Sequence, residues 1–231
     1  MPPSPTDPAL DPTVSGGHRD AMASARTALL EEFAGTFAPE TVAACLADSY
    51  ARLLPASITA HVPLLAHRFA RERLRAATRG RTAYDGGVAR APMVLFVCTA
   101  NSGRSQLAAA LVVHRSAGLV EVASAGTSPG PAVQAEVVAA LAEIGIDASD
   151  LFPKPLTDEV VAGADVVVTM GCGDSCPVVP GRRYLDWGVA DPAGQDLDAV
   201  RAIRDNIDAR VTGLLAGLRG PRGAYLAPHA P

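Results

Sequence analysis

Residues 93–105 read Met-Val-Leu-Phe-Val-Cys-Thr-Ala-Asn-Ser-Gly-Arg-Ser. The first five residues form a continuous apolar run, which is typical of a strand buried on both faces of a parallel sheet. The small and polar residues that follow predict a loop, and a helix is expected over residues 104–115. A strand, a loop and a helix in this order are the beginning of a βαβ unit.

The chain after this stretch keeps alternating short apolar runs with helical patterns. In chain order, the predicted elements are a strand at 120–125, a helix at 132–144, a short helix at 158–163, strands at 166–170 and 183–187, and a helix at 197–218. This alternation predicts an α/β fold of the flavodoxin-like type with a four-stranded parallel sheet.

Residues 20–82 have a different pattern, because their apolar residues recur at intervals of three and four. Prolines at positions 39, 55 and 63 divide the pattern, and a small three-helix domain is therefore expected. The other predicted segments are a disordered tail at 1–19, a linker at 83–92, the α/β domain at 93–219 and a second tail at 220–231. Cys45 lies on the apolar face of the second helix and is expected to serve packing.

The third helix carries a run of basic residues. They are Arg68, Arg71, Arg73, Arg75, Arg79 and Arg81. A solvated helix face is the favoured interpretation, and a docking face for a partner or for the second domain is the alternative.

Composition excludes several classes of partner. The 231 residues carry a net charge of -4 and only 4% aromatic residues, so neither a nucleic acid nor an anionic membrane surface is an expected partner. No apolar run is long enough to span a bilayer, and the N-terminus lacks the order of charges of a signal peptide. We expect a cytoplasmic protein, in which closely spaced thiols serve catalysis, redox chemistry or metal binding.

The loop that begins at Cys98 predicts an oxyanion site. Backbone N–H groups of such a loop converge on an anion, and the following helix N-terminus favours a thiolate. Arg104 can add a planar fork that binds two oxygens of a tetrahedral anion. An inert core cysteine is the alternative, but it does not explain the polar residues in succession. The expected oxyanion-binding residues are Thr99, Ala100, Asn101, Ser102, Gly103, Arg104 and Ser105.

A second pair of thiols, Cys172 and Cys176, follows the valine-rich strand predicted at 166–170. Parallel strands bring this segment to the same sheet edge as Cys98, and two thiols four residues apart can form a disulfide after a rearrangement. Structural thiols and a metal site are the alternatives. No second Cys or His pair stands at ligand spacing, so no bound metal or other cofactor is expected.

With these motifs, residues 93–218 resemble the low-molecular-weight tyrosine phosphatase superfamily, and more closely its arsenate reductase branch. Besides residues 94–106, the resemblance is carried by Ser-Ala-Gly-Thr at 124–127, by Val-Val-Thr-Met-Gly-Cys-Gly-Asp-Ser-Cys-Pro at 167–177, and by Trp187 and Asp-Pro-Ala-Gly at 191–194. Residues 20–81 are similar to a three-helix domain that some members carry.

The resemblance implies a mechanism in which Cys98 attacks arsenate while Asp191 acts as the general acid. A disulfide relay through Cys172 and Cys176 then follows, and thioredoxin, or mycothiol with mycoredoxin, is the external reductant. Phosphatases of the superfamily carry aromatic residues after the Asp-Pro pair, whereas this chain has Ala193 and Gly194. A small oxyanion such as arsenate or phosphate is therefore the expected ligand.

Two other functions stay open. A protein tyrosine phosphatase would use the same Cys98 and leave Cys172 and Cys176 idle. An oxyanion sensor would use the helical domain to bind a partner or DNA, although that domain shows no clear recognition helix. In the chain itself, Gly103 stands where some members carry a further cysteine, and Ala190 stands where relatives often have a second Asp.

Overall fold

The computed structural model describes residues 16–54, 61–82, 90–172 and 178–219. The chain divides into two compact units, Met1–Thr78 and Arg79–Pro231. The predicted end of the helical domain, residue 82, therefore lies four residues beyond this division.

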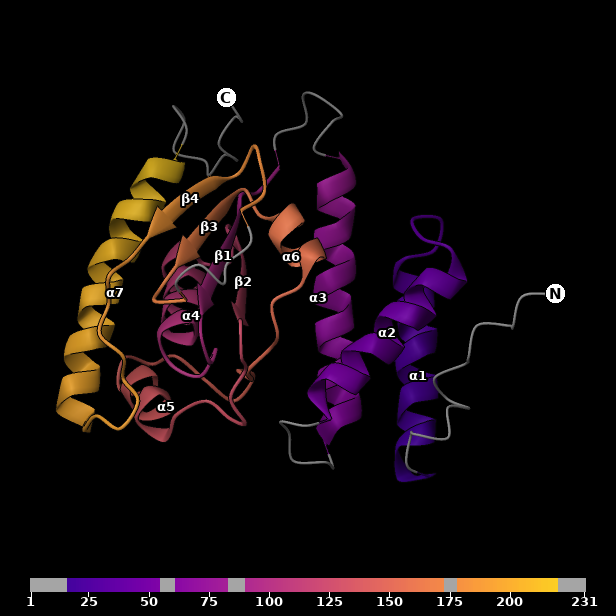
Figure 1. The fold of residues 1–231 in the computed structure, drawn as a ribbon, viewed down its shortest axis with the longest axis horizontal. Coiled ribbons are helices and arrows are strands. Elements are labelled where there is room, and N and C mark those ends of the chain that lie inside the picture. Colours follow the sequence, from indigo (N-terminus) through magenta and orange to yellow (C-terminus); the bar gives the residue numbers. More distant parts are fainter. Residues whose placement is uncertain (1–15, 55–60, 83–89, 173–177, 220–231) are drawn as a thin grey trace. The chain divides into compact units, whose positions relative to one another are not determined.

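The first unit is built from three helices, as its periodicity predicts (Figure 1). They are α1 (Gly16–Glu32), α2 (Pro39–Leu53) and α3 (Val62–Thr82). Helix α1 begins inside the stretch that was expected to be a disordered tail. Nδ1 of His18 lies 2.9 Å from the hydroxyl of Tyr50 in α2, and this hydrogen bond fixes the first turn of α1. The part of the predicted tail at 1–15 is outside the described residues.

Ion pairs join α3 to the other two helices of this unit. Glu32 accepts hydrogen bonds from Arg71 and Arg75 at 2.6 and 2.8 Å, and Asp48 accepts one from Arg73 at 2.6 Å. Burial opposes the ionisation of Glu32, but the two arginines outweigh it and hold the pKa of Glu32 below its usual value. Arg73 is only 5% exposed, so the expectation of a solvated face is wrong for this residue, whereas the side chains of Arg71 and Arg75 are 44% and 55% exposed.

The second unit contains a four-stranded parallel sheet with the order β2-β1-β3-β4, which confirms the predicted α/β fold. The strands are β1 (Met93–Cys98), β2 (Glu121–Gly126), β3 (Val166–Thr169) and β4 (Arg183–Asp186). Every residue of β1 is buried, because this strand lies in the interior of the sheet and both of its faces are covered.

Four helices accompany the sheet: α4 (Arg104–Ser116), α5 (Ala135–Ala142), α6 (Asp158–Gly163) and α7 (Leu197–Leu218). Helices α4, α5 and α7 contact one another, and α6 contacts β1. In Figure 1 the strands lie between α7 and α6. The core formed with α4, α5 and α7 includes Val94, Phe96 and Cys98, the alternate residues of β1.

Helix α5 is shorter than the predicted helix at 132–144, because a tertiary hydrogen bond delays its start and a glycine ends it. The N–H of Gln134 donates to the carbonyl of Ser102 in the loop after β1, so the chain is held in an extended conformation just before the helix. After its last turn, Gly145 takes a left-handed φ of 78°, which ends the helix.

The register of the sheet determines which segments lie together at the carboxyl ends of its strands. Val97 is level with Thr169 in β3, and Cys98 is level with Gly126 in β2. The segments that follow these three strands therefore start at one edge of the sheet, as expected for a parallel α/β fold. No helix of the described part of the chain is long and apolar enough to cross a membrane.

Candidate active site

The loop between β1 and α4 is shaped by hydrogen bonds to the segment 127–134. Its carbonyl oxygens accept backbone N–H groups at 2.8–3.2 Å in the pairs Cys98 with Thr127, Thr99 with Ser128, Ala100 with Gly130, and Ser102 with Gln134. In a trans peptide the N–H points away from the preceding carbonyl. The loop N–H groups are thereby turned to the opposite side, where an anion can bind them.

The sulfur of Cys98 lies on that N–H side. Asn101 donates its backbone N–H to Sγ at 3.2 Å, and the Ser105 hydroxyl oxygen is 3.0 Å from Sγ. The side-chain amide of Asn101 donates to the same hydroxyl oxygen at 2.8 Å, so Ser105 can give its own hydrogen to the sulfur. Cys98 is 2% exposed, so both groups contact a sulfur atom that is shielded from solvent.

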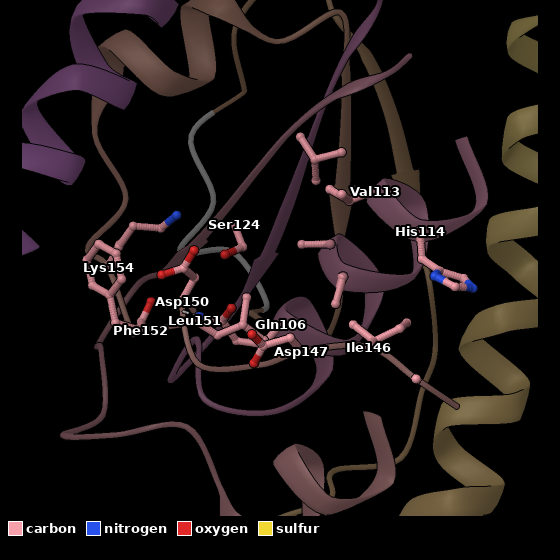
Figure 2. A pocket seen from close by; sticks show the side chains of 14 residues that line it. Gln106, Val113, His114, Ser124, Ile146, Asp147, Asp150, Leu151, Phe152 and Lys154 are labelled. Carbon is pink, nitrogen blue, oxygen red and sulfur yellow. Dashed lines mark hydrogen bonds between the residues drawn. The ribbon is translucent and has the colours of Figure 1, made fainter. Parts of the chain in front are cut away.

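Asn101 itself is held in a left-handed conformation with a φ of 48°. Gln106 donates its amide to the backbone oxygen of Asn101 at 3.0 Å and to the carbonyl of Phe152 at 2.8 Å. The backbone N–H of Lys154 donates to the side-chain oxygen of Asn101 at 2.8 Å. Gln106, Phe152 and Lys154 also line a cavity of about 430 Å³ between α4, β2 and residues 145–154 (Figure 2). The hydrogen bonds from Gln106 and Lys154 therefore hold Asn101 in its strained conformation.

Arg104 and Asp191, both predicted as site residues, lie side by side although 87 positions separate them. Nη2 of Arg104 donates to the Asp191 carboxylate at 2.7 Å, with 11% of the Arg104 and 53% of the Asp191 side chain exposed. The backbone N–H of Ala193 donates to the other carboxylate oxygen at 3.1 Å. An oxyanion that enters the loop therefore competes with Asp191 for the guanidinium.

Gly103 allows the Asp191 loop to lie against the oxyanion loop. A Cβ atom at position 103 would be 2.5 Å from Cγ of Pro192, a distance that the rigid ring does not accommodate. The cysteine that some members carry at this position would therefore require the Asp191 loop to shift.

The two thiol-bearing segments meet through Thr99. Its hydroxyl donates to the carbonyl of Gly171 at 3.1 Å, and Gly171 is followed by Cys172, which is 7% exposed. The hydroxyl of Thr99 therefore links the oxyanion loop to the segment that carries Cys172. Cys176 is outside the described residues.

Three contributors to the site were missed at the sequence level. Gln106 is a polar residue with 1% exposure, and its place directly after the oxyanion motif was the available signal. A Cβ atom at Gly126 would lie 2.7 Å from the carbonyl oxygen of Thr99, which explains the glycine of the 124–127 motif. Gly171 lies against Arg104, and no local pattern indicates that contact. Within the described ranges, no cluster of three or more His, Cys, Asp and Glu side chains could hold a metal ion.

The comparisons with known proteins agree with this geometry. Residues 93–222 match the family model described as low molecular weight phosphotyrosine protein phosphatase. Residues 22–78 match the one described as protein-tyrosine-phosphatase-like, N-terminal domain.

Several proteins that this chain is similar to are named for arsenate reduction. The structure of the thioredoxin-dependent arsenate reductase of Corynebacterium glutamicum is 39% identical, with a TM-score of 0.75, covering 87% of this chain and 97% of that chain. Arsenate reductase 1 of Bacillus cereus is 35% identical over 51% of this chain and 90% of its own length. The glutaredoxin arsenate reductase of Synechocystis is 35% identical over 53% of this chain and 95% of its own length.

The family match covers more than half of the chain, and it falls on the unit that carries Cys98, Arg104 and Asp191. The sheet of this unit has the four parallel strands that the alternation of predicted strands and helices after residue 93 indicates. The chain therefore belongs to the low molecular weight phosphotyrosine protein phosphatase family and carries the N-terminal phosphatase-like domain in addition.

Proposed function

We propose that the protein reduces arsenate to arsenite, with Cys98 as the nucleophile and with Cys172 and Cys176 as the thiols that complete the reduction. The observation that carries this proposal is the hydrogen bond from Thr99, next to Cys98, to Gly171, next to Cys172. Hydrolysis of a phosphoenzyme needs only water after the nucleophile, whereas reduction needs a second thiol nearby. The names of the relatives support the same reaction.

In the first proposed step, the Cys98 thiolate attacks the arsenic atom of arsenate and one As–O bond breaks. Asp191 gives its proton to the departing oxygen, which leaves as water. The guanidinium of Arg104 and the loop N–H groups bind the remaining oxygens. Entry of the anion displaces the Asp191 carboxylate from its ion pair with Arg104, and the freed carboxylate takes up from the protonated arsenate or from solvent the proton that it gives to the departing oxygen.

In the second step, the Cys172 thiolate attacks the sulfur of Cys98, and the S–As bond breaks. The electron pair of that bond stays on arsenic, so arsenite leaves and a Cys98–Cys172 disulfide remains. Cys176 then attacks Cys172, which moves the disulfide to 172–176 and returns Cys98 as a thiolate. Two thiols are oxidised for each arsenic atom reduced by two electrons.

Thioredoxin is the proposed reductant of the 172–176 disulfide, because a relative of matching length is thioredoxin-dependent. The cytoplasm, which keeps thiols reduced, is the proposed compartment. If an external thiol such as mycothiol attacked the arsenic adduct directly, Cys172 and Cys176 would be dispensable.

Replacing Cys172 with serine tests the proposal. Arsenite formation with thioredoxin and thioredoxin reductase should fall to the background without enzyme, because serine cannot attack a sulfur to form a disulfide. Hydrolysis of an aryl phosphate, which needs only the Cys98 site, should stay at the wild-type level. Both rates are measured on the same preparation.

Cys45→Ser is the matched control, because it removes a thiol from the helical unit and should leave both activities unchanged. If Cys172→Ser still formed arsenite with thioredoxin, the relay would be refuted. If the wild-type protein hydrolysed aryl phosphates and formed no arsenite with any thiol, the protein would be a phosphatase.

A further inference from the structure

Gly171, the residue before Cys172, lies against the functional end of Arg104. A Cβ atom at Gly171 would be 2.5 Å from Nη1 of Arg104 and 3.4 Å from its Cζ. Such a distance is far below van der Waals contact, so the guanidinium occupies the space that any side chain at position 171 would need.

The backbone around Gly171 is held from two sides. The N–H of Met170 donates to the carbonyl of Val97 at 2.8 Å, and the hydroxyl of Thr99 donates to the carbonyl of Gly171 at 3.1 Å. Gly171 has a left-handed φ of 73°, which fixes the direction in which a Cβ atom would point. A side chain there would therefore displace the long, flexible side chain of Arg104 before it displaced the backbone.

We propose that Gly171 is a positioning residue of the oxyanion site. Its backbone carries no side chain, so it packs directly against the Arg104 guanidinium and keeps that group directed toward the bound anion. The inference deepens the proposed function and rests on its oxyanion site, but it does not depend on reduction. It also means that the segment that carries the second thiol forms part of the anion site. Anion affinity then depends on the backbone beside Cys172.

The test is Gly171→Ala, with inorganic phosphate as the probe. Binding to the reduced, full-length protein is followed by NMR titration of the loop amides, which also measures weak dissociation constants. We expect the dissociation constant to rise roughly 10- to 100-fold, the loss expected for a broken hydrogen bond to a charged group.

Gly181→Ala is the matched control. Gly181 has nearly the same left-handed conformation, with a φ of 77°, and a Cβ atom there would meet nothing within 4 Å. The left-handed φ strains both variants, so Gly181→Ala measures the effect of that strain alone, while only Gly171→Ala should lose phosphate affinity. Equal phosphate affinity in the two variants would overturn the proposal.

A double-mutant cycle with Arg104→Lys separates a positioning role from a general structural one. If Gly171 acts through the guanidinium, then Gly171→Ala should weaken phosphate binding very little further in the Arg104→Lys background. Fully additive losses would overturn the proposal. If the alanine variants do not fold, Gly171→Asn and Gly181→Asn replace them, because asparagine tolerates a left-handed φ and still carries a Cβ atom.

Failure of this inference and failure of the proposed function give different results. A wild-type protein that binds phosphate but forms no arsenite would refute the reductase and leave the comparison of Gly171 with Gly181 intact. A protein that forms arsenite, and whose Gly171→Ala variant binds phosphate normally, would refute only the role of Gly171.

Discussion

Cys98→Ser should abolish arsenate reduction and aryl phosphate hydrolysis while leaving the fold intact. A serine hydroxyl is not ionised near neutral pH and is a far weaker nucleophile than a thiolate, so both reactions lose their nucleophile. The backbone N–H of Asn101 and the hydroxyl of Ser105 can hydrogen-bond an oxygen as they do the sulfur. The cost in stability should therefore be small, about 1 kcal/mol or less.

Arsenite formation, aryl phosphate hydrolysis and the free energy of unfolding are measured together for this variant and for Cys45→Ser. The Cys98 variant should keep its affinity for phosphate, because the loop N–H groups and Arg104 are unchanged. Arsenate turnover above background in Cys98→Ser would mean that another thiol is the nucleophile.

Arg104→Lys should reduce both activities roughly 10²- to 10³-fold, the loss measured when one donor to a developing oxyanion is removed. An ammonium group is a point charge and cannot bind two oxygens through a planar fork. It also fills less of the space beside Gly171 that the guanidinium occupies. The rate kcat/KM for arsenate and the dissociation constant of phosphate check this expectation.

Arg115→Lys offers a matched control on the same helix. Arg115 forms an ion pair with Asp208 and is 45% exposed, so its replacement should leave catalysis unchanged. If Arg104→Lys kept the wild-type affinity for phosphate, the loop would bind anions through its backbone alone, and the role of the guanidinium would be refuted.

Most of the α/β unit could be predicted from the sequence, because its signals are local. Residues 93–97 are a fully apolar run, and the predicted helix at 197–218 coincides with α7. The role of Asp191 was expected only from the resemblance to the family, and its ion pair with Arg104 was not predicted, because the 86 residues between them carry no signal of contact. The spacing of apolar residues along a helix or strand reflects which face is buried, so it can be read directly from the sequence.

The contacts that complete the site could not be predicted in this way. Asn101 takes its left-handed conformation because Gln106 and the N–H of Lys154 hold it, and these partners come from different segments. The start of α5 depends on the N–H that Gln134 gives to the loop carbonyl of Ser102. Each is a tertiary interaction that overrides the local preference of the chain.

The arginines of α3, in the helical unit, also have tertiary contacts that the sequence did not predict. A run of basic residues predicts a solvated face, but the acidic partners of Arg71, Arg73 and Arg75 lie 25 to 43 positions away in α1 and α2. Arg73 can be buried because its charge is paired with that of Asp48.

One measurement tests the relay most directly. Fully reduced protein is incubated with arsenate in the absence of any added thiol, the remaining thiols are counted, and any disulfide is mapped by peptide mass. The account predicts the loss of two of the four thiols, one arsenite per protein and a Cys172–Cys176 disulfide. Four intact thiols and no arsenite would contradict the internal relay.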